Sequence, residues 1–179
     1  MNYAYIVGAI DESSDKYFNI MLDSLNNCCD CNVILNTQME NLLNTEFDVG
    51  DNVFVLTPDL LIQDDIFNVF DGSFDVAYTN RHYPSDSVVN FSVWAFTFNE
   101  NSKKFIEFLL DQIQNPTWGP LLKFREKIQR VDTNHPWAPQ DFLCAVYKNG
   151  HKIDVPCVIK DIGYKYNFWP APRAFNLNE

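Results

Sequence analysis

One nearly all-apolar run, Asp51–Leu56 (DNVFVL), constrains the fold more than any other segment of this sequence. A strand with one face in water alternates apolar and polar residues, whereas a strand covered on both faces does not have to. The run is followed directly by Thr57-Pro58-Asp59, and proline cannot donate to a sheet ladder, so the strand must stop or turn there. We therefore expect a central strand with other elements packed on both sides of it.

Helix-like and strand-like segments alternate along the rest of the chain. The spacing of apolar residues predicts helices over 15–27, 101–114, 121–129 and 140–147, and short helical segments over 39–43 and 66–70. Strands are expected over 2–10, 31–35, 51–56, 74–79, 88–98 and 153–159. This alternation is typical of α/β proteins, so the sequence predicts a mixed, mostly parallel central sheet flanked by helices.

The composition is that of one acidic, aromatic-rich globular domain. The chain has 179 residues, which fits the length of about 100–200 residues typical of a domain, so we expect a single domain over residues 1–179. An apolar fraction of 46% and 15 Phe exclude a disordered chain. The net charge of −11 argues against nucleic acid as a partner, because cations are needed to displace counterions from a phosphate backbone.

The termini and the cysteines favour a cytoplasmic setting without a membrane. No run of about 18 apolar residues is present, and the N-terminal sequence lacks the basic and apolar regions of a signal peptide. The cysteine count is five, which is odd and favours reduced thiols. Cys28 and Cys31 form a single C-x-x-C without a second pair or a nearby histidine, so ordinary thiols are favoured over a zinc site.

Three segments follow expected strands and are therefore candidates for binding a ligand. They are Gly8–Asp11, Thr57–Asp59 and Thr79–His82. In open α/β sheets, ligands bind beyond the carboxyl ends of the strands. The sequence contains neither a G-x-G-x-x-G nor a G-x-x-x-x-G-K-[ST] motif, so dinucleotide-binding and P-loop interpretations lack their phosphate cradle.

The order of four motifs in this sequence resembles that of a known family. They are V-F-V-L-T-P-D-L-L-I, F-D-V-A-Y-T-N-R, V-N-F-S-V-W-A-F and W-A-P-Q-D-F-L. Over about Asn2 to Tyr147 this order is similar to that of the GT-A fold nucleotide-sugar glycosyltransferases, in particular the glycogenin-like and galactosyltransferase-like branch. The resemblance implies a Rossmann-like GT-A fold, a UDP-sugar or other nucleotide-sugar donor, and an acceptor that the sequence does not identify.

The resemblance also implies a metal site, although its motif is degenerate here. Thr57-Pro58-Asp59 stands where the family has D-x-D, so Asp59 matches the second acid and Thr57 replaces the first. In the family these acids bind Mn²⁺ or Mg²⁺, which bridges the diphosphate and stabilises the leaving group. Asp59 is equally well explained as a cap of the following turn, and the nearby Asp64 and Asp65 are alternative acids whose spacing places them on that turn.

Four further residues match the donor and acceptor side of the family. Arg81 matches a basic residue near the donor, although a solvated loop arginine is the alternative. Asn90 matches the first residue of the N-x-G motif, with Ser92 in place of glycine, and Asn90 is also explained by a bond to a neighbouring backbone group. Asp141 matches an acid that faces the sugar, with N-capping of the following helix as the alternative.

The N-terminal segment matches the place where the family holds the nucleoside. Gly8, Ala9, Ile10 and Asp11 occupy that place, and Tyr17 lies on the first helix, where the family often has a tyrosine. A core or surface aromatic is the simpler explanation of Tyr17.

Two main functions remain open at the level of sequence, while a third, a glycosyltransferase-like protein that acts on nucleic acid, is disfavoured by the net charge of −11 unless the basic helix is the contact. The first is a small glycosyltransferase in which Asp141 and Arg81 take part in catalysis. The second is a catalytically degenerate GT-A-like protein that binds a nucleotide, a sugar or a protein partner. One local basic cluster stands out in this acidic chain and is explained as a solvated helix face or as a dock for an acidic acceptor; it consists of Lys123, Arg125, Lys127 and Arg130.

Overall fold

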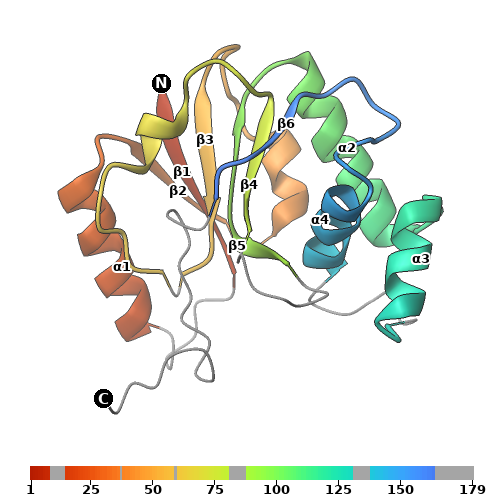
Figure 1. Cartoon of the computed structure of the whole chain (residues 1–179). Coiled ribbons are helices and arrows are strands. Elements are labelled where there is room, and N and C mark those ends of the chain that lie inside the picture. The colour runs from red at the N-terminus through yellow and green to blue at the C-terminus, as the bar shows by residue number, and fades with distance from the viewer. Residues whose placement is uncertain (9–14, 37, 59, 81–87, 131–137, 164–179) are drawn as a thin grey trace.

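A six-stranded sheet forms the centre of the computed structural model (Figure 1). The structure describes residues 1–8, 15–36, 38–58, 60–80, 88–130 and 138–163. The strands are β1 (Asn2–Val7), β2 (Asn32–Asn36), β3 (Asn52–Leu56), β4 (Val76–Asn80), β5 (Val89–Thr97) and β6 (Ile159–Asp161). Their order is β2-β1-β3-β5-β4-β6, and only β5 runs antiparallel to its neighbours within this described sheet. The predicted mixed, mostly parallel sheet is confirmed.

Helices cover both faces of the sheet. One face packs against α1 and η2, and the other against η1, α2 and α4, while α3 packs against α4 (Figure 1). The α-helices are α1 (Asp15–Cys28), α2 (Glu100–Gln114), α3 (Gly119–Lys127) and α4 (Ala138–Lys148). The short 3₁₀ helices are η1 (Met39–Asn44) and η2 (Ile66–Val69). Every predicted helix is present, with ends shifted by no more than two residues.

The apolar run that opened the sequence forms β3, and it is covered on both faces as predicted. Val53 and Val55 pack into the core on the side of α2 and α4. Phe54 and Leu56 pack into the core on the side of η2. The Phe54 ring there packs edge-on against the Phe67 ring, with 5.3 Å between the ring centroids. The side chains of these four residues are at most 1% exposed, which explains why Val53–Leu56 shows no alternation of polar and apolar residues.

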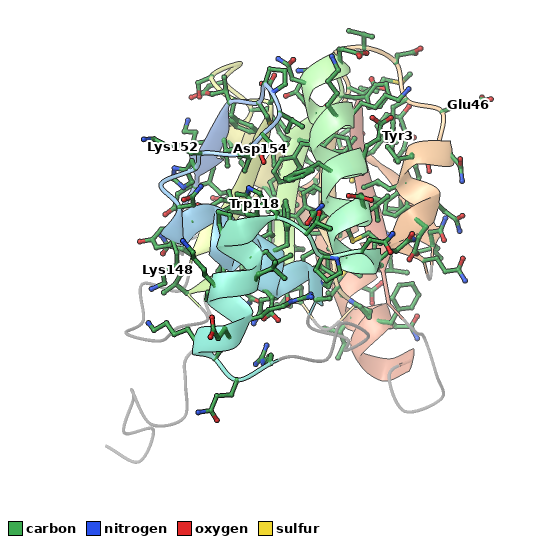
Figure 2. All side chains as sticks on the ribbon, turned by 90° about the vertical axis from the view of Figure 1, so that its right-hand side faces the viewer. Tyr3, Glu46, Trp118, Lys148, Lys152 and Asp154 are labelled. Atoms are coloured by element: carbon green, nitrogen blue, oxygen red, sulfur yellow. The ribbon has the colours of Figure 1, made fainter. Side chains whose placement is uncertain are left out.

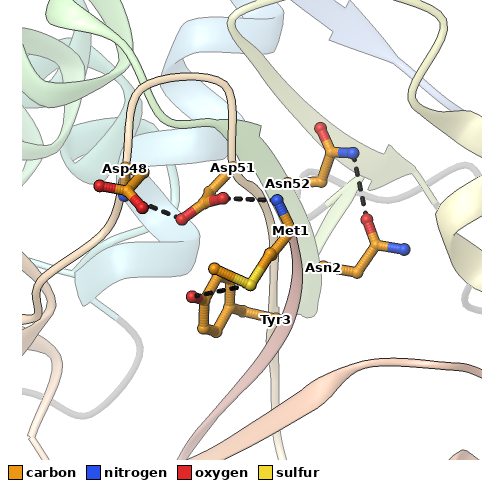
Figure 3. A network of polar contacts seen from close by, with 6 residues as sticks. All are labelled: Met1, Asn2, Tyr3, Asp48, Asp51 and Asn52. Atoms are coloured by element: carbon orange, nitrogen blue, oxygen red, sulfur yellow. Dashed lines mark hydrogen bonds and ion pairs between the residues drawn. The ribbon is translucent and has the colours of Figure 1, made fainter.

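A polar network joins the starts of β1 and β3 (Figure 3). The Met1 ammonium contacts Asp51 Oδ1 at 2.5 Å, and the Asp48 backbone N–H donates to Asp51 Oδ2 at 2.8 Å. The amide of Asn52 donates to Asn2 Oδ1 at 3.2 Å. Asp51 is 3% exposed, so these contacts supply the partners that a buried carboxylate needs.

The predicted strand over 153–159 is wrong. The structure forms β6 only at Ile159–Asp161, parallel to β4. Pro156 lies within the predicted range and cannot donate to a ladder. The apolar residues of this segment instead pack against the core as a loop, and the Val158 N–H donates to the Asp75 carboxylate at 2.7 Å.

The junction of α2 and α3 places α3 on the outside of α4 (Figure 2). Gln112, which is 2% exposed, accepts hydrogen bonds at Oε1 from the backbone N–H groups of Thr117 and Trp118 at 2.8 and 2.7 Å. The Trp118 ring then packs on Phe108 and Phe142. A buried amide thus fixes the start of the helix that carries the basic cluster.

Candidate functional site

Three of the sequence segments predicted to flank a ligand meet at one edge of the sheet. Gly8 follows β1, Thr57 follows β3, and Thr79 lies near the end of β4, so all three lie at the carboxyl ends of parallel strands. Between them lies the start of β5, where the Thr57 N–H donates to the Ser92 carbonyl at 3.1 Å. The sheet pairing therefore brings these positions to one edge of the sheet.

Gly8 and Pro58 are in close contact across this edge. Gly8 has φ of +148°, and a Cβ built on it would lie 3.0 Å from Pro58 Cδ. A residue with a side chain rarely adopts that backbone conformation. Glycine therefore lets the β1 and β3 exits lie against one another.

An irregularity in β5 shapes the middle of the edge. Tyr78 pairs with Trp94, but the next residue, Thr79, pairs with Asn90, so the register shifts there. Bulges of this kind are common beside active sites because they re-aim side chains. Asn90 is 4% exposed and its Oδ1 accepts from the Ser92 N–H at 3.2 Å, so the alternative that Asn90 bonds a neighbouring backbone group is confirmed.

The edge continues to β6 through two polar residues: Asn80, which belongs to the predicted segment Thr79–His82, and Asp161, which was not predicted. The side-chain amide of Asn80 donates to the Asp161 carboxylate. The other oxygen of Asp161 accepts from the Gly163 N–H at 2.8 Å. The position of Asn80 within a predicted ligand-flanking segment was a usable sign, whereas nothing local distinguishes Asp161 before its pairing with β4 is known.

Asp141 lies on α4 at the same end of the sheet. The Cys144 thiol donates to the Val89 carbonyl at the start of β5. Further along α4, the Tyr147 ring packs edge-on against the Tyr78 ring of β4, with 6.5 Å between the ring centroids. The helix therefore runs inward from the carboxyl edge. Asp141 precedes Cys144 by one turn, which places it at that edge.

The Asp141 carboxylate is held by two arginines. Its Oδ1 accepts from Arg130 Nη1 at 2.8 Å, and its Oδ2 lies 3.7 Å from Arg125 Nε. The carboxylate is fully buried, and Asp141 lies within the first turn of α4 rather than before it. The N-capping alternative for Asp141 is therefore wrong. We call Arg125, Arg130 and Asp141 together the α3–α4 corner.

The C-terminal turn of α3 brings the two arginines together. The Arg130 N–H donates to the Arg125 carbonyl at 2.9 Å, and the Gln129 N–H donates to the Glu126 carbonyl at 3.1 Å. Gln129 between them has φ of +57°. This pair of bonds around a left-handed residue is a Schellman motif, which here folds Arg130 back beside Arg125.

Burial divides the predicted basic helix face. Lys123 and Lys127 are exposed, as a solvated face requires, but Arg125 is 4% exposed and Arg130 is half-buried. The solvated-face explanation is therefore wrong for Arg125. The burial of Arg125 could have been predicted, because it follows Leu121 by four residues and Phe124 by one and so lies on the apolar side of α3.

The electrostatics of the corner favour an incoming anion. Burial lowers the pKa of the Arg125 guanidinium, and the Asp141 carboxylate opposes that shift. Among the described residues, none of the guanidinium nitrogens of Arg125 has a hydrogen-bond partner. Two guanidinium groups share one carboxylate, so the trio carries a net positive charge in a chain whose net charge is −11.

Several predicted site residues lie outside the described residues. They are Ala9, Ile10, Asp11, Asp59 and Arg81. Tyr17 is placed in α1 by its backbone, without a described side chain. Their proposed roles therefore stay predictions.

The described residues do not by themselves form a metal site. No three His, Cys, Asp or Glu side chains group there in a way that would hold an ion. Asp64 Oδ1 accepts from the Asp65 N–H at 2.8 Å, and Asp65 Oδ1 accepts from the Phe67 N–H at 2.9 Å, capping η2. Asp64 and Asp65 thus accept hydrogen bonds from backbone groups of the turn on which they lie, as their spacing indicated. Asp59 remains the candidate metal ligand.

Comparisons with known proteins identify a fold. No family model and no curated protein matches the sequence. The glycosyltransferase GlyE of Streptococcus pneumoniae TIGR4 has a similar structure, with a TM-score of 0.55, 14% identity, and coverage of 92% of this chain and 46% of that chain. Its apo form gives a TM-score of 0.49, 13% identity, and coverage of 82% and 43%. This chain has a glycosyltransferase-like fold and spans less than half the length of that protein.

Within the described ranges, no helix has both the length and the apolar character needed to cross a bilayer.

Proposed function

We propose that this protein is a glycosyltransferase that binds a nucleotide-sugar donor, a UDP-sugar, at the carboxyl edge of its sheet. One observation carries the proposal: Gly8, Thr57 and Ser92, which are far apart in sequence, meet at that edge in a glycosyltransferase-like fold. Ligands of open α/β sheets bind at this edge. The family resemblance in the sequence supports the same donor.

The donor's nucleoside is assigned to the exit of β1 and its diphosphate to the exit of β3. Gly8–Asp11 hold the base, with Tyr17 beside them. Asp59 serves the diphosphate, directly or through Mn²⁺ or Mg²⁺, and such an ion would supply positive charge for the leaving group. Arg81 contributes a further cation on the donor side.

The sugar and the acceptor are assigned to the β5 side of the edge. Asn90 and Ser92 line the acceptor side, and Asp141 serves the sugar-binding part of the site indirectly, by holding Arg130 in place. In the transfer step, the bond from sugar C1 to the diphosphate oxygen breaks and a bond from C1 to the acceptor oxygen forms. The acceptor's hydroxyl proton passes to solvent or to the released diphosphate, and the fixed positive charges stabilise the developing negative charge.

A second function is favoured by one specific observation. Asp141 is fully buried between two arginines, and Thr57 stands in place of an acid of the D-x-D motif. A catalytically degenerate protein that binds a nucleotide or sugar, without transferring it, would tolerate both features.

Titration of UDP-sugars separates the two functions. Calorimetry with and without MnCl₂ is expected to show binding of UDP-sugar to the wild type, and chromatography is expected to show slow hydrolysis of the donor. Asp59→Ala should abolish hydrolysis, while Glu107→Ala, which removes an exposed acid from α2, should leave it unchanged. Binding without hydrolysis supports the degenerate protein, and a wild type that binds no nucleotide refutes the glycosyltransferase.

A further inference from the structure

The α3–α4 corner has a buried cation whose hydrogen-bonding capacity is unmet. Arg125 is 4% exposed, and its nitrogens have no hydrogen-bond partner within the described part of the chain. Its link to Asp141 is an ion pair of 3.7 Å rather than a hydrogen bond. Burying a guanidinium in this way is costly unless further charge of opposite sign is nearby. The Asp141 carboxylate meets only part of that need, because Arg130 shares it.

Arg130 is the member of the corner that can reach a ligand. Its Nη1 donates to Asp141 at 2.8 Å, and its side chain is 36% exposed. A guanidinium has five N–H donors in a planar fork, so one bond to Asp141 leaves others for a second anion. The Schellman turn and the Asp141 carboxylate fix this side chain from two directions.

The corner lies where a donor would be bound. Asp141 is at the carboxyl edge, one turn before Cys144, which contacts the start of β5. The β3 exit lies at the same edge, and Thr57 stands there where the resembled family has an acid, so this edge has one carboxylate fewer than that family to repel an anion. A guanidinium fork binds phosphate with two parallel hydrogen bonds.

We propose that the α3–α4 corner binds a phosphate oxyanion, with Arg130 as the direct donor and Asp141 as the positioning residue that holds it. The inference rests on the proposed function, in which the donor's diphosphate is one source of the phosphate; a phosphorylated acceptor is the other. Arg125 supplies the surplus positive charge from behind, within the buried layer between α3 and α4.

Calorimetric titration of the full chain with three probes tests this assignment: UDP, inorganic pyrophosphate and glucose 1-phosphate. Arg130→Gln is expected to weaken binding of the phosphate by about tenfold or more, the effect of losing a charge-assisted hydrogen bond. Arg130→Lys should bind phosphate with an affinity between those of wild type and Arg130→Gln, since it keeps the positive charge and loses the planar fork of donors. Lys123→Gln, which removes an exposed charge from the same helix, is the matched control and should bind within about twofold of wild type.

The probes distinguish the two sources. Sensitivity of UDP and pyrophosphate binding to Arg130→Gln assigns the corner to the donor, and sensitivity of glucose 1-phosphate binding alone assigns it to an acceptor. If the wild type binds pyrophosphate through Arg130 but not UDP, the corner stands and the proposed function fails. If the wild type binds UDP and Arg130→Gln binds all probes equally well, the corner is refuted while the proposed function stands.

A double-mutant cycle tests the positioning role of Asp141. Asp141→Asn is expected to weaken pyrophosphate binding in wild type but to add little in the Arg130→Gln background, because the two residues act as a unit. A merely structural role would lower the melting temperature and leave the affinity of the folded protein unchanged. Additive effects on affinity would therefore refute the positioning role, and because Arg130 is partly exposed, its own variants are expected to fold.

Discussion

Gln129 has a backbone conformation that suits glycine better than glutamine. It has φ of +57° in the Schellman turn that ends α3, whereas the matching turn of α4 has Gly150, with φ of +64°. A left-handed conformation costs a residue with a side chain about 1–2 kcal/mol. Gln129 directly precedes Arg130 of the α3–α4 corner, and strained residues tend to occur at functional sites.

Replacement of Gln129 tests whether this residue adopts the left-handed conformation of a Schellman turn. Gln129→Gly is expected to raise the free energy of unfolding by about 1 kcal/mol, because glycine adopts this conformation without a steric penalty. Gly150→Ala should lower it by a similar amount. Urea denaturation followed by circular dichroism measures both, and a loss of stability in Gln129→Gly would contradict the assigned turn.

Two cysteines, Cys31 and Cys157, have the electrostatics of unreactive thiols. Burial raises the pKa of Cys31 to about 11, with the charges of Cys29, Asp30 and Asp65 adding to the shift. Burial, followed by the charge of Asp75, raises the pKa of Cys157 to about 12. The thiolate is the reactive form, so both groups stay protonated and slow to react at neutral pH.

Alkylation measures this directly. In native protein at pH 7.5, iodoacetamide should modify Cys31 and Cys157 far more slowly than a free cysteine, and the rates should keep rising as the pH increases toward 11. Their raised pKa values also mean that these thiols stabilise the fold below about pH 9 and lose that contribution as the pH approaches 11–12. Rapid modification at neutral pH, read by peptide mass spectrometry, would contradict the burial of these thiols.

At the scale of elements, the exits of β1 and β3 depend on the contact between Gly8 and Pro58. Gly8→Ala is expected to lower the free energy of unfolding by about 1–3 kcal/mol, because the new Cβ would lie 3.0 Å from Pro58 and the φ of +148° disfavours alanine. Gly72→Ala is the matched control: Gly72 also has positive φ, but a Cβ there meets nothing within 4 Å, so it reports the backbone penalty alone. Equal losses in both variants would show that the contact with Pro58 contributes nothing.

The sequence predicted elements well where the pattern was local. β3 is apolar from Val53 to Leu56 and is covered on both faces, and the ends of α2 follow the apolar spacing. The strand predicted over 153–159 failed because apolar residues in a loop can pack into a core without pairing, and Pro156 interrupts the ladder. Long-range pairing with β4, which no local pattern encodes, decides where β6 lies.

The site was predicted in part, for a physical reason visible in its residues. The place of Gly8 and Thr57 at strand ends could be predicted because strand ends can be read from sequence, and the parallel pairing of β1 with β3 brings the two positions to one edge. Arg125 was assigned to a solvated face because its charge outweighed its place in the apolar spacing of α3. The pairing of Arg130 with Asp141 depends on the packing of two helices, which becomes visible only in three dimensions.

At the scale of the whole molecule, the fold joins two arrangements at one edge of the sheet. The first is the group of strand exits around Gly8 and Thr57. The second is the positively charged α3–α4 corner. In a bound nucleotide-sugar, the base would lie at the β1 exit near Gly8, and the negatively charged diphosphate would lie between the β3 exit near Thr57 and the α3–α4 corner. The chain has the fold of a glycosyltransferase within less than half the length of the similar protein, and this edge is where we assign its donor.

A crystal structure of the protein soaked with UDP and MnCl₂ tests that assignment most directly. We predict electron density for the nucleotide beyond the carboxyl ends of β1 and β3, with the base near Gly8 and the phosphates on the side of Thr57 and Arg130. Density for UDP at the amino edge of the sheet, or an empty carboxyl edge at saturating UDP, would contradict it.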